Sequence, residues 1–597
     1  MLAQVNSIIK EAVAFESASK NLLSQIHPRY QASAKNLLHY QVLRRHDLSS
    51  LQQKLGTMGL SRLAKAQSHV MASLKTNRAI LKSILTHTKV KKAVGELSFK
   101  KGNRLLQENA KNLLGYKTVG RRTRIMVTMP SEAADNYQMV HDMIEAGMNC
   151  ARVNCAHDNA EAWDKMIANV RKAAEALGKD CKVAMDLAGP KIRTGAIEPG
   201  PRVLKIRPAK DVWGNIKRAL EIWIGPEARP GMLHVPISED DLPLLEGQSM
   251  LYLKDTRGKK RKIKLIQREG NGYLASCAKT TFVATNLLLY PSEELAGRSI
   301  VIGELPSQEL PLLLRVGDQL RLDKAPIIGK TAQYNDAGEL LEIAHISCRA
   351  PAIFEEVEVG QRILFDDGKI EGKIKSVNDT HMMIDIVQAA AGLAKLRAEK
   401  GINLPDSQLT ISGLTDKDKA DLVFVATHAD VINFSFVNRP EDVTELFDCL
   451  KDLKARDNIG VVLKIETQSG FNCLPDILFR AMEVYPVGVM IARGDLAIES
   501  GWSNIGRVQE EILSLCQAAH VTDIWATQVL ESLAKSGLPS RAEITDAVMS
   551  QRADCVMLNK GPYILQAIQL LDTILKDMEP YRDKNAPLSP ILAKASL

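Results

Sequence analysis

The sequence lacks the features that would mark a membrane-spanning, secreted or disulfide-bonded protein. None of its apolar runs reaches the length of a membrane-spanning helix. The N-terminal stretch "MLAQVNSIIKEAVAFESASK" has no basic flank followed by a long apolar core, so we do not expect a secretory signal. The 9 cysteines are scattered without a Cys-x-x-Cys pair, which argues against a disulfide framework and a structural zinc site. We therefore expect a globular, reduced, cytoplasmic protein without a membrane partner.

The common local motifs of nucleotide and metal chemistry are also missing. The sequence has no Gly-x4-Gly-Lys-Ser/Thr loop and no well-placed Gly-x-Gly-x-x-Gly. It has no His-Glu-x-x-His and no nucleophile elbow. Candidate residues therefore have to be collected from the expected fold rather than from one motif.

Positive charge exceeds negative charge, and the excess is uneven. The formal net charge is +8, and the stretch from Lys89 to Arg124 is dense in Lys and Arg. That stretch has few aromatic residues for stacking and matches no recognised nucleic-acid-binding module. We interpret it as a solvated helical linker and do not expect nucleic acid as a partner.

The first part of the chain has the apolar spacing of helices. Leu48, Leu51 and Leu55 recur at intervals near 3.6 residues, which predicts one buried stripe. Gly56 and Gly59 follow as helix breakers. We predict that residues 1–120 form a helical N-terminal extension with no chemistry of its own.

From Arg122 onward, short β-rich runs alternate with helical stretches. Most of these runs are apolar throughout, as expected of parallel strands that are covered on both faces. The eight runs are "TRIMVTM", "CARVN", "KVAMDL", "DVINFSF", "GVVLKIE", "GVMIARGD", "DIWATQV" and "DCVMLN". This series predicts an α/β fold, a (β/α)8 TIM barrel. We place strands 1–3 in residues 121–195, strands 4–8 in 406–580, and a C-terminal tail in 581–597.

An insertion with a different pattern interrupts the series after the third strand. Residues 196–405 hold many short alternating runs with Gly, Pro and Asn-Asp turns, which predicts an inserted β-rich lid domain. A Gly-Gln, an apolar triplet, an Asp and a Gly recur in order in "EGQSMLYLKDTRG" and "VGQRILFDDGK". This recurrence indicates an internal duplication.

Active sites of such barrels lie at the carboxyl ends of the strands, so the polar residues there are the candidates. One Lys or Asp at a strand end is more often a surface salt bridge than a catalyst. Here five of the eight strands end in charged or hydrogen-bonding groups, which would meet at one rim. They are Arg152, Asn154, His157, Asp186, Lys191, Arg193, Lys464, Glu466, Arg493, Asp495, Thr527 and Gln528.

These residues divide into two chemical sets. Glu466 and Asp495 supply hard oxygen ligands, which suit Mg2+ or Mn2+. The cations around them favour a highly anionic substrate such as a phosphate ester. Gly494 leaves room for a ligand to approach the backbone. Spacing alone thus predicts a metal-dependent barrel enzyme that acts on a phosphorylated substrate.

The motifs together resemble the pyruvate kinase family, over about Arg122 to Glu579. The resemblance rests on "EAGMNCARVNCAHD", "VAMDLAGPKIRTG", "KGINLP", "VVLKIET", "VMIARGDLAIE", "WATQVLES" and "PSRAE", which occur in the family's order. It implies phosphoryl transfer from phosphoenolpyruvate to ADP, giving pyruvate and ATP. Charge neutralisation and positioning do most of the catalysis in such reactions.

The resemblance also implies residue roles. Lys464 would stabilise charge on the phosphoryl group and the enolate, and Arg152 and Arg193 would hold the phosphoryl group. Thr527 would lie where the enolate is protonated. Glu466 and Asp495 would bind the divalent metal. His157 and Lys400 would lie near the nucleotide.

Several positions depart from the family pattern. Ala156 and Leu187 replace two of the usual K+ ligands, while Asn154 and Asp186 keep the other two. Lys191 stands where the family has Glu, and a fixed ammonium in place of the cation predicts K+ independence. "LNKGPYILQAI" replaces the family's "SGETA" loop near the nucleotide. The sequence ends soon after Glu579, so we expect no C-terminal regulatory domain, and a homodimer through barrel helices.

Two alternatives stay open at this point. The altered loop after Leu558 favours a phosphoenolpyruvate-binding enzyme with another phosphoryl acceptor. A non-catalytic sensor or scaffold that uses residues 1–120 to bind a partner would show ligand binding without turnover. A screen of phosphoryl acceptors with phosphoenolpyruvate distinguishes the first alternative from a pyruvate kinase. Deletion of residues 1–120 tests the second, because it should abolish binding of the partner.

Overall fold

A closed parallel barrel of eight strands is the main structural feature of the chain. The computed structural model describes residues 1–90, 97–213 and 215–582, so most of the predicted C-terminal tail lies outside the described residues. The barrel order is β1-β2-β3-β25-β26-β27-β28-β29, which confirms all eight predicted strands. Their bounds are β1 Arg124–Thr128, β2 Cys150–Asn154, β3 Lys182–Asp186, β25 Val431–Phe434, β26 Gly460–Ile465, β27 Val487–Ala492, β28 Thr522–Ala526 and β29 Cys555–Leu558.

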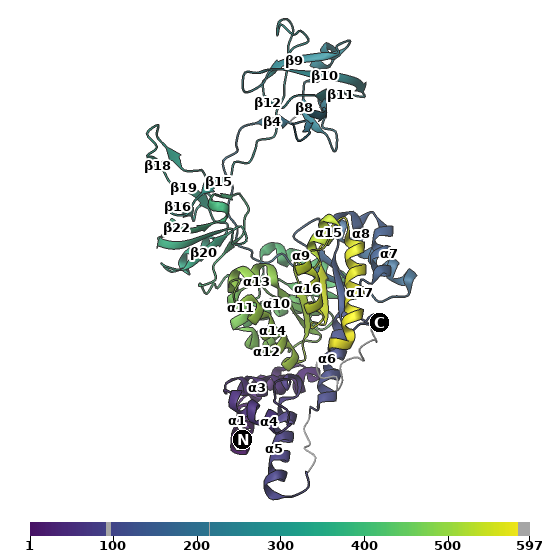
Figure 1. Ribbon diagram of the computed structural model, residues 1–597, viewed down its shortest axis with the longest axis vertical. Coiled ribbons are helices and arrows are strands. Elements are labelled where there is room, and N and C mark those ends of the chain that lie inside the picture. The colour runs from purple at the N-terminus through teal and green to yellow at the C-terminus, as the bar shows by residue number, and fades with distance from the viewer. Residues whose placement is uncertain (91–96, 214, 583–597) are drawn as a thin grey trace. The chain divides into compact units, whose positions relative to one another are not determined.

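Helices surround the barrel (Figure 1). They are α7 Tyr137–Ala146, α8 Ala160–Leu177, α9 Asp416–His428, α10 Pro440–Asp452, α11 Gln468–Asn472, α12 Leu474–Ala481, α13 Arg493–Ser500, α14 Ile505–Ala519, α15 Glu531–Ser536, α16 Arg541–Ser550 and α17 Ile564–Arg582. Among the described helices, none combines the length and the apolar character needed to cross a membrane.

The barrel interior follows the two-residue alternation of the strands. Met126, Cys150, Ala184 and Val462 belong to one buried apolar cluster inside the barrel. Their strand neighbours, such as Ile125 and Val127, pack instead into the layer between strands and helices. Because the side chains alternate, the inward positions two residues further along each strand lie one layer closer to the carboxyl ends.

The N-terminal extension is helical, as predicted, and packs against the amino-terminal end of the barrel. Its helices are α1 Leu2–Ala18, α2 Lys20–Gln25, α3 Gln31–Arg44, α4 Ser49–Thr57, α5 Val70–Thr86 and α6 Phe99–Leu114. At the end of α6, Leu113 belongs to the cluster inside the barrel. A β-carbon at Gly460 or Gly488 would lie 2.6 Å from Leu113, so these strands need glycine there. Residues 91–96 of the basic stretch lie outside the described residues. Phe99–Leu114 is helical, and its last turn is buried against the barrel rather than solvated, which corrects the interpretation of that part as a solvated linker.

Hydrogen bonds fix this helical layer to the barrel. Val487 N donates to the buried hydroxyl of Tyr30 at 3.0 Å. Asn36 donates from Nδ2 to the carbonyl of Ala518 at 2.8 Å. Each bond satisfies a polar group that would otherwise be stranded at a strand or helix end. The helices therefore behave as part of the barrel unit rather than as an appended arm.

A neutral histidine lies at the centre of this layer, and we expect it to make the layer acid-sensitive. His520 is fully buried, its Nε2 donates to the carbonyl of Ser68 at 2.9 Å, and burial lowers its pKa to about 4. The unfolded chain binds the proton near pH 6.5, so stability falls as pH drops from 6.5 towards 4. Between pH 7 and pH 5 we expect a loss of about 2 kcal/mol.

Thermal unfolding at the two pH values measures this loss. The control is His520→Asn, because asparagine does not titrate and tolerates the left-handed backbone found here, where φ is 49°. His69, whose own pKa is lowered by burial, is present in both proteins. An equal pH dependence in the two proteins would assign the effect to other groups.

The chain divides into two compact units, which we describe separately. The first comprises Met1–Arg193, Ala350–Asp379 and Gly401–Leu597, and the second comprises Thr194–Arg349 and Thr380–Lys400. The first unit adds an antiparallel ladder of β20 Arg362–Phe365 with β21 Ile370–Val377 and β24 Ile402–Asn403. The predicted boundaries at 120, 195, 405 and 580 and the internal duplication stay predictions.

The second unit is built of β structure, as expected for the insertion. Its five-stranded sheet runs β8-β7-β11-β10-β9, and β16 lies between β19 and β22 in another ladder. Residues from Ile206 to Leu305 enclose a separate hydrophobic core. The bounds are β4 Val203–Ile206, β7 Leu220–Gly225, β8 Leu233–Pro236, β9 Met250–Lys254, β10 Lys260–Glu269, β11 Gly272–Cys277, β12 Thr281–Ala284, β13 Leu288–Leu289, β14 Ile300–Val301, β15 Leu312–Leu314, β16 Gln319–Asp323, β19 Ala344–Ser347, β22 His381–Ala389 and β23 Ala394–Leu396, with short pairs β5 Ala209–Lys210 and β6 Ile216–Arg218, and β17 Gln333–Tyr334 and β18 Leu340–Glu342.

Candidate active site

A polar layer closes the carboxyl end of the barrel above the apolar interior. Two residues beyond Cys150, Ala184, Val431 and Val462, the inward positions carry polar or charged side chains. All of these side chains are buried, so each must find its partner inside the barrel. They are Arg152, Asp186, Asn433 and Lys464.

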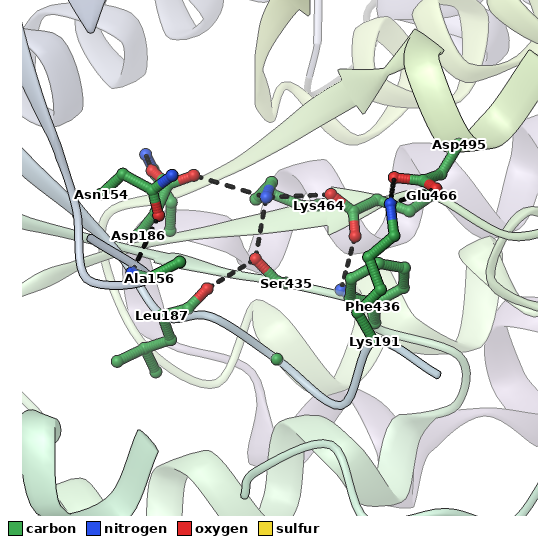
Figure 2. Close-up of polar contacts among 12 residues, drawn as sticks. Asn154, Ala156, Asp186, Leu187, Lys191, Ser435, Phe436, Lys464, Glu466 and Asp495 are labelled. Atoms are coloured by element: carbon green, nitrogen blue, oxygen red, sulfur yellow. Dashed lines mark hydrogen bonds and ion pairs between the residues drawn. The ribbon is translucent and has the colours of Figure 1, made fainter. Parts of the chain in front are cut away.

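Lys464 is the centre of this layer (Figure 2). Its Nζ lies 2.9 Å from Glu466 Oε1 and 3.4 Å from Asp186 Oδ2, and donates to Ser435 Oγ at 2.8 Å. Burial disfavours the ammonium, but the carboxylates of Glu466 and Asp186 outweigh burial and raise the pKa of Lys464 above its usual value. The side chain is therefore a fixed positive charge inside the barrel mouth.

Arg152 forms a buried ion pair beside it. Its Nη2 lies 2.6 Å from Asp186 Oδ2, and its Nη1 donates to Thr128 Oγ1 at 2.9 Å. Burial opposes the charge on Asp186, but Arg152 and Lys464 prevail and lower its pKa. The buried Nε of Arg152 has no hydrogen-bond partner among the described residues. A buried cationic donor without an acceptor suits an anionic ligand.

Two carboxylates form the second part of the site. Glu466 accepts from the backbone N–H of Phe436 at 3.2 Å, and burial together with the nearby charge of Asp495 raises its pKa. Lys191 Nζ donates to both oxygens of Asp495, at 2.8 and 3.0 Å (Figure 2). Crowded carboxylate oxygens at the mouth of a barrel are the donor set of a divalent cation. Glu466 and Asp495 therefore fit a divalent cation, once Lys191 releases Asp495.

A strained turn follows β28. Thr527 and Gln528 both have left-handed backbones, with φ of 73° and 60°. A β-carbon at Gly494 would lie 3.1 Å from the Thr527 methyl group, so glycine there admits the close approach of this turn. Arg493 Nε donates to the carbonyl of Ala526 at 2.8 Å, and its guanidinium also bonds Asp546. Such strain is held in place by its surroundings and is typical of functional sites.

A pocket adjoins the polar layer, and Arg152 lines it. Its volume is about 260 Å³, and Asn154 and His157 line it after β2. The altered loop after β29 contributes Asn559 and Lys560 to the same pocket. Asn559 donates to Glu531 at 2.7 Å, which attaches this loop to α15. The short loop therefore brings a lysine to a concave, polar surface.

Three predicted residues have contacts in the structure that differ from those of the polar layer around Lys464. Lys400 belongs to the second unit, where its N–H donates to Thr194 Oγ1 at 2.9 Å. Arg193 ends a segment of the first unit and is bridged through its backbone to Gly401. Lys191 lies on Asp495 and not beside Asn154 or Asp186. Its predicted replacement of K+ therefore stays a prediction.

Sequence reasoning missed several residues of the polar layer. Asn433 donates to Asp186, Ser435 bonds both Lys464 and the carbonyl of Leu187, and Thr128 accepts from Arg152. All of them stand at the carboxyl ends of strands that the sequence did reveal. The signal was present, because Thr128, Asn433 and Ser435 interrupt the first and fourth apolar runs near their carboxyl ends.

Comparison with known proteins identifies the family. The sequence model described as "Pyruvate kinase, barrel domain" matches residues 120–222 and 313–568, which is more than half of the chain. The chain belongs to the pyruvate kinase family. Residues 223–312 lie outside the matched ranges, so the family model does not account for the five-stranded sheet from β8 onward.

Individual members of the pyruvate kinase family are similar at modest identity. The pyruvate kinase of Bacillus licheniformis is 26% identical over 466 residues, covering 77% of this chain and 57% of that protein. That of Clostridium perfringens is 30% identical over 240 residues, or 39% and 48% of the two chains. The Rattus norvegicus enzyme is 25% identical over 472 residues, or 77% and 60%. The chain thus spans roughly half to three fifths of the length of these relatives.

A solved structure supports the fold. The crystal structure of a pyruvate kinase from Cryptosporidium parvum superimposes with a TM-score of 0.51 at 21% identity. The match covers 78% of this chain and 72% of that one. The architecture of a barrel with an inserted β domain is therefore the one known in the family.

Proposed function

We propose that this protein transfers the phosphoryl group of phosphoenolpyruvate to ADP, giving pyruvate and ATP. The observation that carries the proposal is the position of Lys464, which lies between two buried carboxylates in a barrel of the pyruvate kinase family. A phosphoryl group in transfer spreads negative charge over its oxygens, and fixed cations stabilise that charge.

The side chains divide the work of this reaction. Lys464 neutralises charge on the phosphoryl group and on the enolate oxygen that it leaves behind. Arg152 holds the phosphoryl group through its Nε, which has no hydrogen-bond partner among the described residues. Arg193 assists from the end of its segment. Thr527, which lies close to Gly494, directs a proton to the enolate carbon.

Glu466 and Asp495 would hold the divalent metal. A divalent cation there supplies charge that neutralises the phosphate and carboxylate oxygens of the substrate. Before the metal binds, Lys191 keeps Asp495 neutralised. Binding of the metal would therefore require Lys191 to leave Asp495.

The pocket beside Arg152 is our proposed site for the acceptor. His157 and Lys560 line it and supply polar groups to a diphosphate. The role near the nucleotide that the resemblance implies for Lys400 stays a prediction. The volume of about 260 Å³ admits a polar group of that size next to the phosphoryl donor.

The first test is pyruvate formation from phosphoenolpyruvate, Mg2+ and ADP by the full chain. We expect turnover with ADP that disappears when the divalent metal is chelated. Binding of phosphoenolpyruvate without turnover would instead favour a second candidate, an enzyme with another phosphoryl acceptor. The altered loop at Lys560 is the observation behind that candidate, and a panel of nucleoside diphosphates and other anionic acceptors in the same assay separates the two.

We expect K+ to change the rate less than tenfold. Asp186, which the resemblance makes a K+ ligand, already contacts Arg152 and Lys464. The carbonyl of Leu187 already accepts from Ser435. Positive charge is therefore supplied by the protein itself. Rates in KCl and in tetramethylammonium chloride at equal ionic strength measure the effect, and tenfold or greater activation by K+ would refute it.

Lys191→Glu separates two roles for that lysine. If Lys191 supplies the charge that K+ supplies elsewhere, the variant gains activation by K+. If Lys191 acts only on Asp495, the variant stays indifferent to K+ and changes its apparent metal affinity.

A cytoplasmic location and a homodimer through barrel helices complete the proposal.

A further inference from the structure

The second unit contains a concentrated positive charge that the proposed reaction does not use. From Lys254 to Lys264, seven cations accompany a single acid, Asp255. Asp255 forms ion pairs with two arginines: its Oδ2 lies 2.6 Å from Arg257 Nη2 and 3.5 Å from Arg261 Nε. The lysines of this stretch remain, and all are exposed. They are Lys254, Lys259, Lys260, Lys262 and Lys264.

Strand geometry brings most of these lysines to one face. Lys260, Lys262 and Lys264 alternate along β10 with the buried Ile263 and Leu265. Their side chains therefore share the solvent face of the sheet. Lys254 on β9 lies directly opposite Lys260 and joins the same face.

Aromatic side chains stand in the middle of this basic face. Tyr252 lies directly opposite Lys262, and Tyr290 pairs with Tyr252 through two backbone hydrogen bonds of 2.7 and 2.8 Å. Residues paired in this way point to the same side of a sheet. A row of two half-exposed rings and one ammonium thus crosses the face between the other lysines.

Nothing inside the described part of the protein compensates this charge. None of the five lysines forms an ion pair in the described residues, although acids are numerous elsewhere in the unit. Like charges directly opposite each other, such as Lys254 and Lys260, destabilise a sheet. Protection of a sheet edge does not explain the three lysines of β10 either, because β10 lies between β9 and β11, whereas Lys254 lies on the terminal strand β9 (Figure 1).

The family barrel also leaves this face unexplained. The five-stranded sheet has its own core, which includes Ile263, Leu265 and Ala275. It lies almost wholly in residues 223–312, which the family's sequence model does not match. A separately folded sheet whose charge has no internal partner is expected to meet its partner outside the chain.

We propose that the exposed face of β9 and β10 binds single-stranded nucleic acid. Successive lysines on β10 are two residues apart, about 6.8 Å along the strand, a step comparable to that between phosphates of an extended single strand. The tyrosines offer surfaces for stacking bases, which a protein partner would not require. Basic grooves combined with aromatic platforms are the usual means of binding single strands.

The test is fluorescence anisotropy of labelled oligothymidylate and oligouridylate with the full chain. We expect binding whose affinity falls with salt, with a slope of about −0.7 for each phosphate neutralised. Lys260→Glu/Lys262→Glu/Lys264→Glu should weaken it at least about tenfold. Tyr252→Ala, which leaves the charge intact, should weaken it by about tenfold through lost stacking.

A matched control changes the same charge on the N-terminal helices, as Lys10→Glu/Lys20→Glu/Lys54→Glu, where all three lysines are exposed. It should bind like the original chain. If circular dichroism shows that the triple glutamate variant is misfolded, Lys260→Gln/Lys262→Gln/Lys264→Gln takes its place. The proposal would be overturned if the original chain did not bind the oligonucleotides at low salt. It would also be overturned if Lys260→Glu/Lys262→Glu/Lys264→Glu bound them as tightly as the original chain. The proposal would also be overturned if polyglutamate displaced the oligonucleotide as well as unlabelled oligonucleotide does and if Tyr252→Ala left binding unchanged. That result would assign the face to an acidic polypeptide.

Discussion

Replacing Lys464 by methionine should lower kcat for pyruvate formation by about 10³-fold or more, because a fixed charge is removed from the point where negative charge develops. Methionine keeps most of the length and volume of the lysine stem. The ammonium that lies 2.9 Å from Glu466 and 3.4 Å from Asp186 is lost. No neighbouring group can replace it, since Arg152 is already committed to Asp186 and Thr128.

The control for this variant is Lys451→Met, which removes an exposed lysine from the last turn of α10. It should leave the rate unchanged. Because Lys464→Met leaves two buried carboxylates without their shared ammonium, thermal unfolding has to show that the variant is folded. A folded Lys464→Met protein that keeps more than about a tenth of its kcat would remove Lys464 from the mechanism.

Much of the barrel could be predicted because its strands are buried on both faces. Such strands appear in the sequence as short continuous apolar runs, and all eight were identified. The strand ends then indicated the site, since parallel strands deliver their last residues to one rim. Lys464, Glu466, Asp186 and Arg152 were selected on this ground, and they do contact one another.

The rest depended on contacts between distant segments. The insertion of Leu113 beside Gly460 and Gly488 joins residues more than three hundred positions apart, and no local periodicity reports it. The partner of Lys191 also depends on its side-chain reach, because Asp495 and Asp186 are both acids at the same rim. Short polar residues such as Ser435 carry no distinctive signal until the lysine that they contact has been placed.

Arg152 offers the second large effect, because it serves both the fold and the reaction. Among the described residues, Arg152 is the only cation within 3 Å of Asp186, and its buried Nε has no partner. Arg152→Met removes both the charge and this donor. Breaking a buried ion pair on one side costs about 3–5 kcal/mol. Losing a donor to the transition state costs about 10²–10³ in kcat. We therefore expect a lower unfolding temperature together with a lower rate.

The double variant Arg152→Met/Asp186→Asn separates the two effects. In the single variant the carboxylate of Asp186 keeps only the more distant ammonium of Lys464, at 3.4 Å. Asparagine removes that carboxylate, so part of the lost stability should return. Asn433, which donates to Asp186 in the original chain, still has an oxygen acceptor at that position. The rate should not return, because the cation that holds the phosphoryl group is still missing. Recovery of both stability and rate would show that Arg152 only neutralises Asp186, and that the phosphoryl group is held elsewhere in the site.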